Sequence, residues 1–417
     1  MTLIRKLTES DLDEFVRIAT EAYPGTKLFS AEDRHKMKER LLDQMEDDRQ
    51  SLYGAYRGKQ LVGGMRCHDF TMNLFGKKIL AGGVGMVAVD LRYKKEKICR
   101  DMIQLYLAHY RKMGAPIAVL WPFRPDFYRK MGFGYGAKIS QYKIKPESIP
   151  KGNSKKHIRC FGKGYIPALT EFYNRYCLLR NGMIDETEIG FKKILERDDN
   201  QWLVGYEKNG RISGYINFGF AQAHEKSWLL NNMVIRELLF ESREALQEIL
   251  TFLNGQSDQI HNIVISVVDD DFHHVFLDPR NGTNNTIPSV YHESHTCGVG
   301  VMYRVLDTAG IWKVLADHNF NHQSFRAKFT INDSFVTANS RSIILDMDDG
   351  LVTAHTRGGY DFEVQIDISD FSSMLMGAIT FEKLWQYGRA EISNKQAVLP
   401  ISRAFLCDKK PLCLTAF

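Results

Sequence analysis

A basic run stands between a strand-like and a helix-like segment in the first third of the chain. The strand-like residues 84–90 read Val-Gly-Met-Val-Ala-Val-Asp, and helical apolar spacing begins at Ile98. The run between them carries four basic side chains, Arg92, Lys94, Lys95 and Lys97. Free backbone N–H groups and the helix dipole favour negative charge at a helix N-terminus. The pattern predicts a site for a phosphate-bearing ligand, although such runs are more often solvated turns.

Three regular elements and a turn must position this basic run. Residues 82–90 predict a buried strand, residues 97–112 a helix, and residues 117–121 a second buried strand. An aromatic-glycine turn follows at residues 127–133, Phe-Tyr-Arg-Lys-Met-Gly-Phe. Together they form a βαβ-like unit whose first connection is the cationic loop.

The composition is that of an ordinary globular protein. The 417 residues are 44% apolar and 25% charged, and this length predicts two or three domains. The net charge of +5 is mild and no basic-aromatic stripe accompanies it, so we expect no nucleic acid partner. No apolar run reaches about 18 residues, so we expect no membrane span. The first residues lack the apolar core of a signal peptide.

The seven cysteines predict reduced thiols. They are scattered, odd in number and free of any C-x-x-C pair, so we expect a cytoplasmic protein. Residues 292–297 resemble a metal site through His292, His295 and Cys297, but no second ligand cluster accompanies them. We therefore expect no metal and interpret these residues as a solvated loop between domains. Four histidines without visible partners are assigned no role: His68, His109, His273 and His274.

An internal repeat divides the first 295 residues. Residues 52–65 and 202–216 each predict a hairpin, and each hairpin precedes a Met-Val strand and a helix. We therefore expect two copies of one α/β domain, residues 1–150 and 151–295. In place of the basic run, the second copy has acidic residues, Glu237, Glu241 and Glu244. These would repel a pyrophosphate, so we expect the second copy to be structural.

The remaining segments predict further elements of the first copy and a third domain. Further elements of the first copy are predicted over residues 2–8, 12–19, 31–48 and 70–79. Elements of the tail are predicted over residues 311–316, 325–332, 342–346, 351–356 and 367–377. The mixture indicates an α+β domain over residues 296–417.

These motifs resemble known families. Residues 84–133 resemble the acetyl-CoA core of the GNAT acetyltransferases, through the Val-x-Val strand, the basic turn and the Phe-Tyr…Gly-Phe turn. The tail resembles a sterol-carrier-protein-2-like (SCP2-like) domain, through residues 303–307 and 370–377. Two GNAT-like copies followed by that tail resemble the Eis (enhanced intracellular survival) N-acetyltransferase family over the whole chain. The implied fold class is α/β (α+β), with two tandem GNAT-like domains and an SCP2-like domain.

The resemblance also implies an activity and its residues. The family acetylates amines of aminoglycosides and some lysine side chains with acetyl-CoA as co-substrate. It places the general acid at Tyr128 and the general base at the α-carboxylate of the last residue, Phe417. It places the cofactor contacts at Val87, Ala88, Val89, Lys94, Lys95, Glu96, Lys97, Ile98, Cys99, Arg100, Phe123 and Arg124. It also implies a homo-oligomer, a hexamer.

The basic loop departs from the family pattern. Lys97 and Cys99 stand where the family has glycines, which let the backbone close on the pyrophosphate. Two interpretations follow. The lysines replace backbone contacts with charge–charge contacts, or the loop binds acetyl-CoA weakly or not at all.

The chemistry of acetyl transfer requires groups of the kinds that these residues carry. Backbone N–H groups at residues 87–89 can polarise the thioester carbonyl, and a tyrosine hydroxyl can protonate the leaving thiolate. An α-carboxylate has an unperturbed pKa of about 3.3–3.7, so it becomes a useful base only when desolvated. The apolar residues 414–417 would supply that environment.

Two functions from different classes stay open. The first is acetyl-CoA-dependent N-acetylation of a cationic acceptor, an aminoglycoside, a polyamine or a lysine. The second is a catalytically weak or inactive GNAT-derived protein that binds an apolar ligand or a partner through its SCP2-like domain. Tyr128 and the apolar C-terminus favour the enzyme, and the missing loop glycines favour the binder. Outside this family, such a tyrosine is more often a core aromatic, and such a C-terminus usually only docks.

Overall fold

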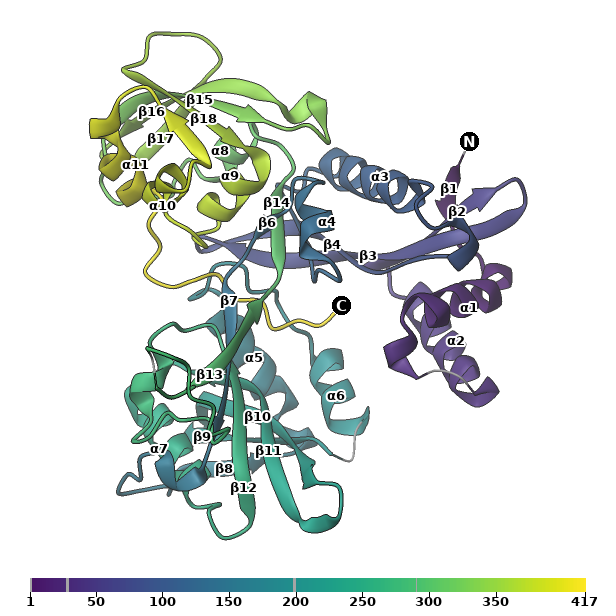
Figure 1. Cartoon of the computed structure of the whole chain (residues 1–417), viewed down its shortest axis with the longest axis vertical. Coiled ribbons are helices and arrows are strands. Elements are labelled where there is room, and N and C mark those ends of the chain that lie inside the picture. The colour runs from purple at the N-terminus through teal and green to yellow at the C-terminus, as the bar shows by residue number, and fades with distance from the viewer. Residues whose placement is uncertain (1, 28–29, 198–199, 290) are drawn as a thin grey trace. The chain divides into compact units, whose positions relative to one another are not determined.

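The computed structural model describes residues 2–27, 30–197, 200–289 and 291–417 as a mixed α/β protein with three sheets (Figure 1). It divides into two compact units. The first unit holds Met1–Gly136, Val301–Asp408 and Thr415–Phe417, and the second holds Ala137–Gly300 and Lys409–Leu414. Both units are therefore built from segments that are distant in the sequence.

The first unit contains a seven-stranded sheet in the order β1-β2-β3-β4-β5-β14-β6. Its strands are β1 (Leu3–Lys6), β2 (Gln50–Arg57), β3 (Gln60–Leu74), β4 (Lys77–Val89), β5 (Ile117–Leu120), β6 (Gly134–Tyr135) and β14 (Met302–Val305). The β4–β5 pair is parallel, and the other pairs are antiparallel. Residues 303–305, interpreted from the sequence as the opening of the tail, thus belong to the first sheet.

Helices cover both faces of this sheet. They are α1 (Leu12–Ala22), α2 (Ala31–Met45), α3 (Ile98–Lys112) and the short α4 (Pro125–Arg129). Leu61 packs in the cluster under α1, and its neighbour Val62 packs in the cluster under α3. Successive strand residues point to opposite faces, so α1 and α3 lie on opposite sides of the sheet.

The strand predicted over residues 70–79 is wrong. The structure places its first half at the end of β3 and its last residues in β4. Phe75 and Gly76 form the turn between them, with φ of 52° and 83°. Left-handed backbone at two successive residues reverses the chain, and the apolar pattern of the segment does not reveal it.

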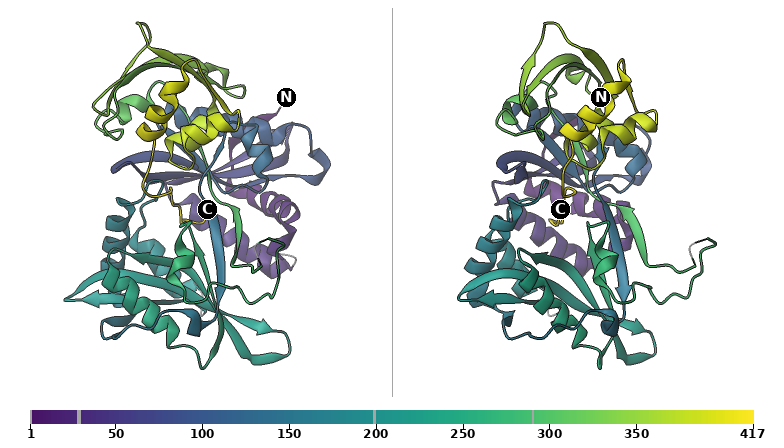
Figure 2. Two further views of the ribbon diagram at one scale, coloured as in Figure 1. Left: turned by 60° about the vertical axis from the view of Figure 1, so that its left-hand side comes forward. Right: turned by 90° about the vertical axis from the view of Figure 1, so that its left-hand side faces the viewer.

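The tail of the first unit forms a five-stranded sheet in the order β17-β16-β15-β18-β19. Its strands are β15 (Phe325–Asn332), β16 (Arg341–Asp348), β17 (Leu351–His355), β18 (Phe362–Asp367) and β19 (Ala390–Ile392). Its helices are α8 (Ile311–Val314), α9 (Ile368–Leu375), α10 (Phe381–Gln386) and α11 (Val398–Ala404). Figure 2 shows α9, α10 and α11 in yellow against the green strands. The capped helix predicted here is confirmed, because the Asp367 side chain accepts a hydrogen bond from Ser369 N.

The second unit contains a seven-stranded sheet in the order β13-β7-β12-β11-β10-β9-β8. Its strands are β7 (Lys138–Ile144), β8 (Ile158–Phe161), β9 (Trp202–Lys208), β10 (Arg211–His224), β11 (Ser227–Phe240), β12 (Ile260–Val267) and β13 (His295–Val299). Its helices are α5 (Ile166–Cys177), α6 (Glu188–Arg197) and α7 (Arg243–Asn254). The succession β9-β10-β11-α7-β12 repeats β2-β3-β4-α3-β5, including the parallel last pair, which confirms the internal repeat.

Two details of the second unit differ from the sequence predictions. His295 and Cys297 lie in β13, paired with β7, and not in a loop. Glu237 lies within β11, where it accepts a hydrogen bond from Tyr215 Oη at 2.7 Å. Only two residues separate β11 from α7, so the second copy has no counterpart of the basic loop in its described residues.

Candidate active site

Strands β4 and β5 of the first sheet pair over only part of the length of β4. The two strands pair in parallel from Ala81 to Gly83. Farther along, β4 carries a bulge opposite β3: Gly85 pairs with Arg66, Ala88 pairs with Gly64, and Met86 between them has φ 53°. A bulge bends its strand and re-aims its side chains. The backbone of residues 87–89 thus lies beyond the stretch that pairs with β5.

A cavity of about 600 Å³ opens beside this part of β4, and we call it the larger cavity. Most of the predicted cofactor-binding residues line it, namely Val87, Val89, Lys94, Lys95, Lys97, Ile98, Cys99, Arg100, Phe123 and Arg124. Two do not. The Ala88 side chain is buried in the cluster under α1, and Glu96 pairs with Arg57 Nη2 at 3.4 Å. The alternation of side chains along β4 explains the first case.

One basic side chain of the loop is paired with a buried carboxylate, and the three lysines are not. Asp90 is buried and accepts from Arg92 Nη2 at 2.8 Å and Arg17 Nη2 at 2.6 Å. The guanidinium groups hold the pKa of the Asp90 carboxyl well below its usual range. By contrast Lys94, Lys95 and Lys97 are exposed and form no ion pair with any described residue. Three positive charges at the mouth of the larger cavity therefore lack a counterion within the described residues.

The loop has a left-handed backbone without glycine. Lys95 has φ 68°, and Lys97, the N-cap of α3, has φ 65° and ψ 8°. Such a conformation costs a non-glycine residue roughly 1–2 kcal/mol. Cys99, at the other glycine position, lies inside α3 and needs no such conformation. The chain thus adopts left-handed geometry at one position where the family has glycine.

A second cavity of about 380 Å³, the smaller cavity, adjoins the larger one. Tyr23, Val87, Phe123 and Tyr128 line both. Phe417 lines only the smaller cavity and not the larger one. Tyr128 and the C-terminal residue, both predicted from the family resemblance, therefore border one space.

The Tyr128 hydroxyl is a protonated group at neutral pH. The residue is 7% exposed, on α4, and burial raises the pKa of its hydroxyl well above the usual range. Its hydroxyl forms no hydrogen bond within the described part of the chain. Nearby, Tyr23 donates to Val87 O at 2.8 Å, and burial raises the pKa of Tyr23 to about 12. Burial also raises the pKa of Cys99 to about 12, so this thiol stays neutral.

The C-terminal residue is held by aromatic and backbone contacts. The Phe417 ring packs against Phe70, with centroids 4.9 Å apart, and against His68 at 5.7 Å. Trp121 Nε1 donates to Thr415 O at 3.0 Å. A Cβ added at Gly85 would lie 2.7 Å from the carboxyl carbon of Phe417. The terminal carboxylate therefore rests directly on β4, beside the bulge.

His68, assigned no role from the sequence, belongs to this arrangement. Its Nε2 accepts from Arg66 Nε at 2.9 Å, and its ring stacks on Phe70. Burial lowers the pKa of His68 to about 3, so the ring is neutral. Its position opposite the strand that carries Gly85 becomes visible only once β3 and β4 are paired.

The described residues contain no group of three or more His, Cys, Asp and Glu side chains placed to hold a metal ion. No helix of the described chain is long and apolar enough to cross a membrane.

Comparisons with known families find two acetyltransferase segments followed by a third domain of another family. The family described as "Acetyltransferase (GNAT) domain" matches residues 3–136 and, with a second sequence model of the same description, residues 182–305. The family described as "Sterol carrier protein domain" matches residues 312–414.

Relatives and solved structures agree with this assignment. An "Uncharacterized N-acetyltransferase" of Streptomyces avermitilis is 24% identical over 200 residues, which are 44% of this chain and 48% of that protein. An "Uncharacterized N-acetyltransferase" of Streptomyces coelicolor is 24% identical over 172 residues, 38% of this chain and 41% of that protein. The chain spans about half or less of the length of these curated relatives.

Two solved structures share the fold over the whole of both chains. A GCN5-related N-acetyltransferase from Anabaena variabilis has a TM-score of 0.81 at 17% identity. Eis1 from Mycobacterium abscessus has a TM-score of 0.78 at 17% identity.

Proposed function

The chain belongs to the GNAT acetyltransferase family, and on this premise we propose that it transfers the acetyl group of acetyl-CoA to an amine. One observation carries the proposal. Tyr128 and the terminal carboxylate of Phe417 border the same cavity, beside the bulge of β4 and next to a cavity with an uncompensated basic loop. They would supply an acid, a base, backbone N–H groups beside the bulge and an anion-binding surface, the four parts that acetyl transfer needs.

Acetyl-CoA would occupy the larger cavity. Lys94, Lys95 and Lys97 would meet its phosphates, as would the free N–H groups of the first turn of α3. The left-handed backbone at Lys97 supports the interpretation in which charge compensates for the missing glycines. The thioester would then lie near Val87, where the two cavities meet.

The transfer itself balances with these groups. The amine nitrogen attacks the thioester carbon, and backbone N–H groups of residues 87–89 stabilise the charge on the oxygen. The carbon–sulfur bond then breaks, and Tyr128 gives its proton to the thiolate of coenzyme A. The ammonium proton formed on attack passes to the Phe417 carboxylate. The deprotonated tyrosine and the protonated carboxyl return to their first states through solvent.

The charge of the smaller cavity bears on the acceptor. No Asp or Glu side chain is among the described residues lining it, whereas Arg66 is. Aromatic and apolar groups such as Trp121 and Met37 form much of the rest. A polycation such as an aminoglycoside or a polyamine would meet one carboxylate there, that of Phe417. Of the expected acceptors, a lysine side chain therefore fits this cavity best.

Calorimetry and kinetics on the untagged protein test the proposal. Acetyl-CoA is titrated into the wild type and into the triple variant Lys94→Ala, Lys95→Ala, Lys97→Ala. We expect binding that weakens with salt and is lost in the triple variant, since three charge contacts are removed. Failure of the wild type to bind acetyl-CoA would overturn the proposal.

Deleting Phe417 tests the catalytic part. We expect thiol release from acetyl-CoA, measured with a lysine peptide, a polyamine and an aminoglycoside, to fall at least 100-fold while acetyl-CoA still binds. A tag appended after Phe417 should also lower the rate of thiol release. Wild-type turnover in the folded deletion variant would exclude the terminal carboxylate as the base.

A further inference from the structure

One wall of the larger cavity comes from outside the acetyltransferase domain. Phe335 lines the cavity together with Met131 and the loop lysines. It belongs to the segment between β15 and β16, inside the sterol carrier protein domain. Its half-buried ring packs against the core cluster beneath α3. A ligand in this cavity would therefore meet a side chain of the C-terminal domain.

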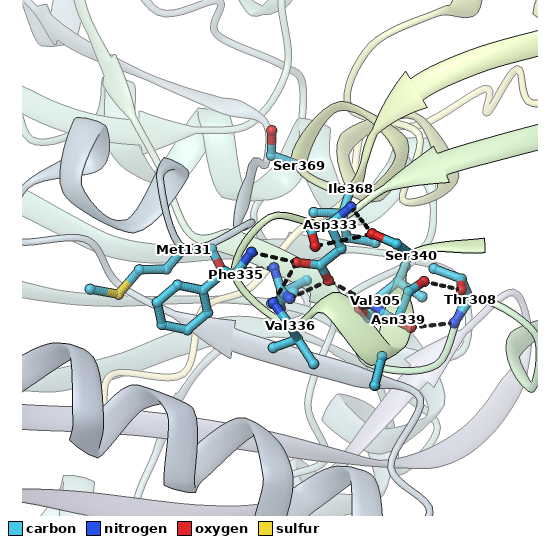
Figure 3. Close-up of polar contacts among 12 residues, drawn as sticks. Met131, Val305, Thr308, Asp333, Phe335, Val336, Asn339, Ser340, Ile368 and Ser369 are labelled. Atoms are coloured by element: carbon cyan, nitrogen blue, oxygen red, sulfur yellow. Dashed lines mark hydrogen bonds and ion pairs between the residues drawn. The ribbon is translucent and has the colours of Figure 1, made fainter.

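The backbone that carries Phe335 is held by a buried carboxylate. Asp333 Oδ1 accepts from Phe335 N at 3.1 Å and Val336 N at 2.8 Å (Figure 3). Asp333 Oδ2 accepts from Asn339 Nδ2 at 3.1 Å. The backbone of Asp333 is fixed as well, since its N–H donates to Ser340 Oγ at 2.6 Å and its carbonyl accepts from that hydroxyl at 3.0 Å. The turn at Phe335 is thus determined before any ligand arrives.

A single guanidinium joins this turn to Met131, which also lines the larger cavity. Arg304 lies on β14, and its Nη2 donates to Asp333 Oδ2 at 2.5 Å, with the two side chains 1% and 0% exposed. Its Nη1 donates to Met131 O at 2.7 Å. Gly132, at φ 81°, makes this possible, because a Cβ there would collide with the guanidinium. Both Met131 and Phe335 line the larger cavity, so Arg304 sets their separation.

We propose that Phe335 is a coenzyme-contact residue: its ring packs against the coenzyme A portion of acetyl-CoA in the larger cavity. An aromatic side chain offers a large apolar face with few rotatable bonds. The Arg304–Asp333 pair holds that face in place, and preorganisation of this kind lowers the cost of binding. The SCP2-like domain thereby helps to form the cofactor site, in addition to carrying the chain to its terminal carboxylate. This inference rests on the proposed function.

Binding of acetyl-CoA to the untagged full chain tests the inference. We expect Phe335→Ala to raise the calorimetric Kd about tenfold, which corresponds to about 1.4 kcal/mol, because the apolar face of the ring is removed. The Kd of Phe335→Leu, which keeps an apolar side chain, should lie between the Kd of the wild type and that of Phe335→Ala. Ser334→Ala, at the exposed neighbouring position, is the matched control and should bind as the wild type does. Ser334→Ala should also keep the kcat of the wild type. In the two Phe335 variants the Kd for acetyl-CoA should change more than the kcat, because Phe335 lines the larger cavity and not the smaller one.

The outcomes separate this inference from the proposed function. Wild-type affinity in Phe335→Ala, together with lost affinity in the triple lysine variant, would overturn the contact and leave the acetyltransferase proposal standing. A wild type without affinity for acetyl-CoA would overturn both. If Phe335→Ala has a lowered Tm, the leucine variant decides, and wild-type affinity there in a folded protein overturns the contact.

Discussion

Replacing Gly85 with alanine probes the proposed base while leaving every functional group in the chain. A Cβ on Gly85 would lie 2.7 Å from the carboxyl carbon of Phe417 and 3.0 Å from its oxygen. Carbon atoms in contact are about 3.5–4.0 Å apart. The carboxylate must therefore move by roughly 1 Å, since a strand backbone yields less readily than the last residue of a chain. Gly85 has no left-handed φ, so alanine suits its backbone.

A displacement of this size at a reacting group lowers the rate about 100-fold, which corresponds to about 2.7 kcal/mol in the barrier. We expect that loss in kcat, measured by thiol release at saturating acetyl-CoA and amine. Acetyl-CoA affinity should be unchanged, because Gly85 lines the smaller cavity. The Tm should change little, because the terminal residue can shift outward.

Gly359→Ala provides the control in the same unit, because a Cβ there has no neighbour within 4 Å. It should match the wild type in kcat and Tm. A Gly85→Ala protein with wild-type Tm and kcat within about twofold of the wild type would refute the role of the terminal carboxylate as base. A loss of Tm without a loss of kcat would show that the C-terminus docks for stability alone.

Three further predictions concern other groups. Tyr128→Phe removes the proton donor and should lower kcat by about 10²–10⁴-fold with little change in acetyl-CoA affinity, measured by steady-state kinetics. Lys97→Gly relieves a left-handed lysine and should stabilise the first unit by about 1 kcal/mol, visible as a higher Tm. Glu237→Gln should remove a pH dependence of stability. Burial raises the pKa of Glu237 to about 7 from 4.5, so the stability it contributes is present below pH 4.5 and is lost as the pH rises through 7. By pH 8 the loss amounts to up to about 3 kcal/mol, measured as Tm against pH.

Controls and contrary results differ among the three. Unchanged kcat in Tyr128→Phe would mean that solvent protonates the thiolate. Lys112→Gly, in the last turn of α3, is the control for Lys97→Gly. It should lower the Tm, because glycine is unfavourable inside a helix. Glu244→Gln, at an exposed position, should leave the pH profile unchanged. Parallel Tm profiles of Glu237→Gln and wild type from pH 4.5 to 8 would contradict the assignment to Glu237.

Much of the lining of the larger cavity could be predicted, because its residues are close to one another in the sequence. The strand, the basic loop and α3 are consecutive, and their periodicity and charge are local properties. The left-handed backbone at Lys95 and Lys97 could not be predicted, because lysine has no preference for it. The bulge at Met86 was likewise hidden, since the register of β4 depends on its pairing with β3.

The contribution of the tail is a property of the tertiary structure. The motif at residues 303–307 indicated a domain opening, but its strand joins the first sheet between β5 and β6. Nothing in the sequence near Phe335 marks it as a cavity wall, because its position follows from Asp333 and from Arg304 on another strand. Likewise His68 showed no partner in the sequence, and Gly85 looked like one glycine among several until Phe417 was seen to rest on it.

The sequence by itself indicated most of the elements, the repeat, the basic loop and, through the family it resembles, the residues proposed as acid and base. The tertiary structure decided which of those residues share a cavity and which distant residues hold them there. The physical reason is that hydrogen-bonded turns and apolar periods arise among neighbours in the chain. Cavity walls arise from contacts between residues hundreds of positions apart, whose partners are chosen by the packing of the whole unit.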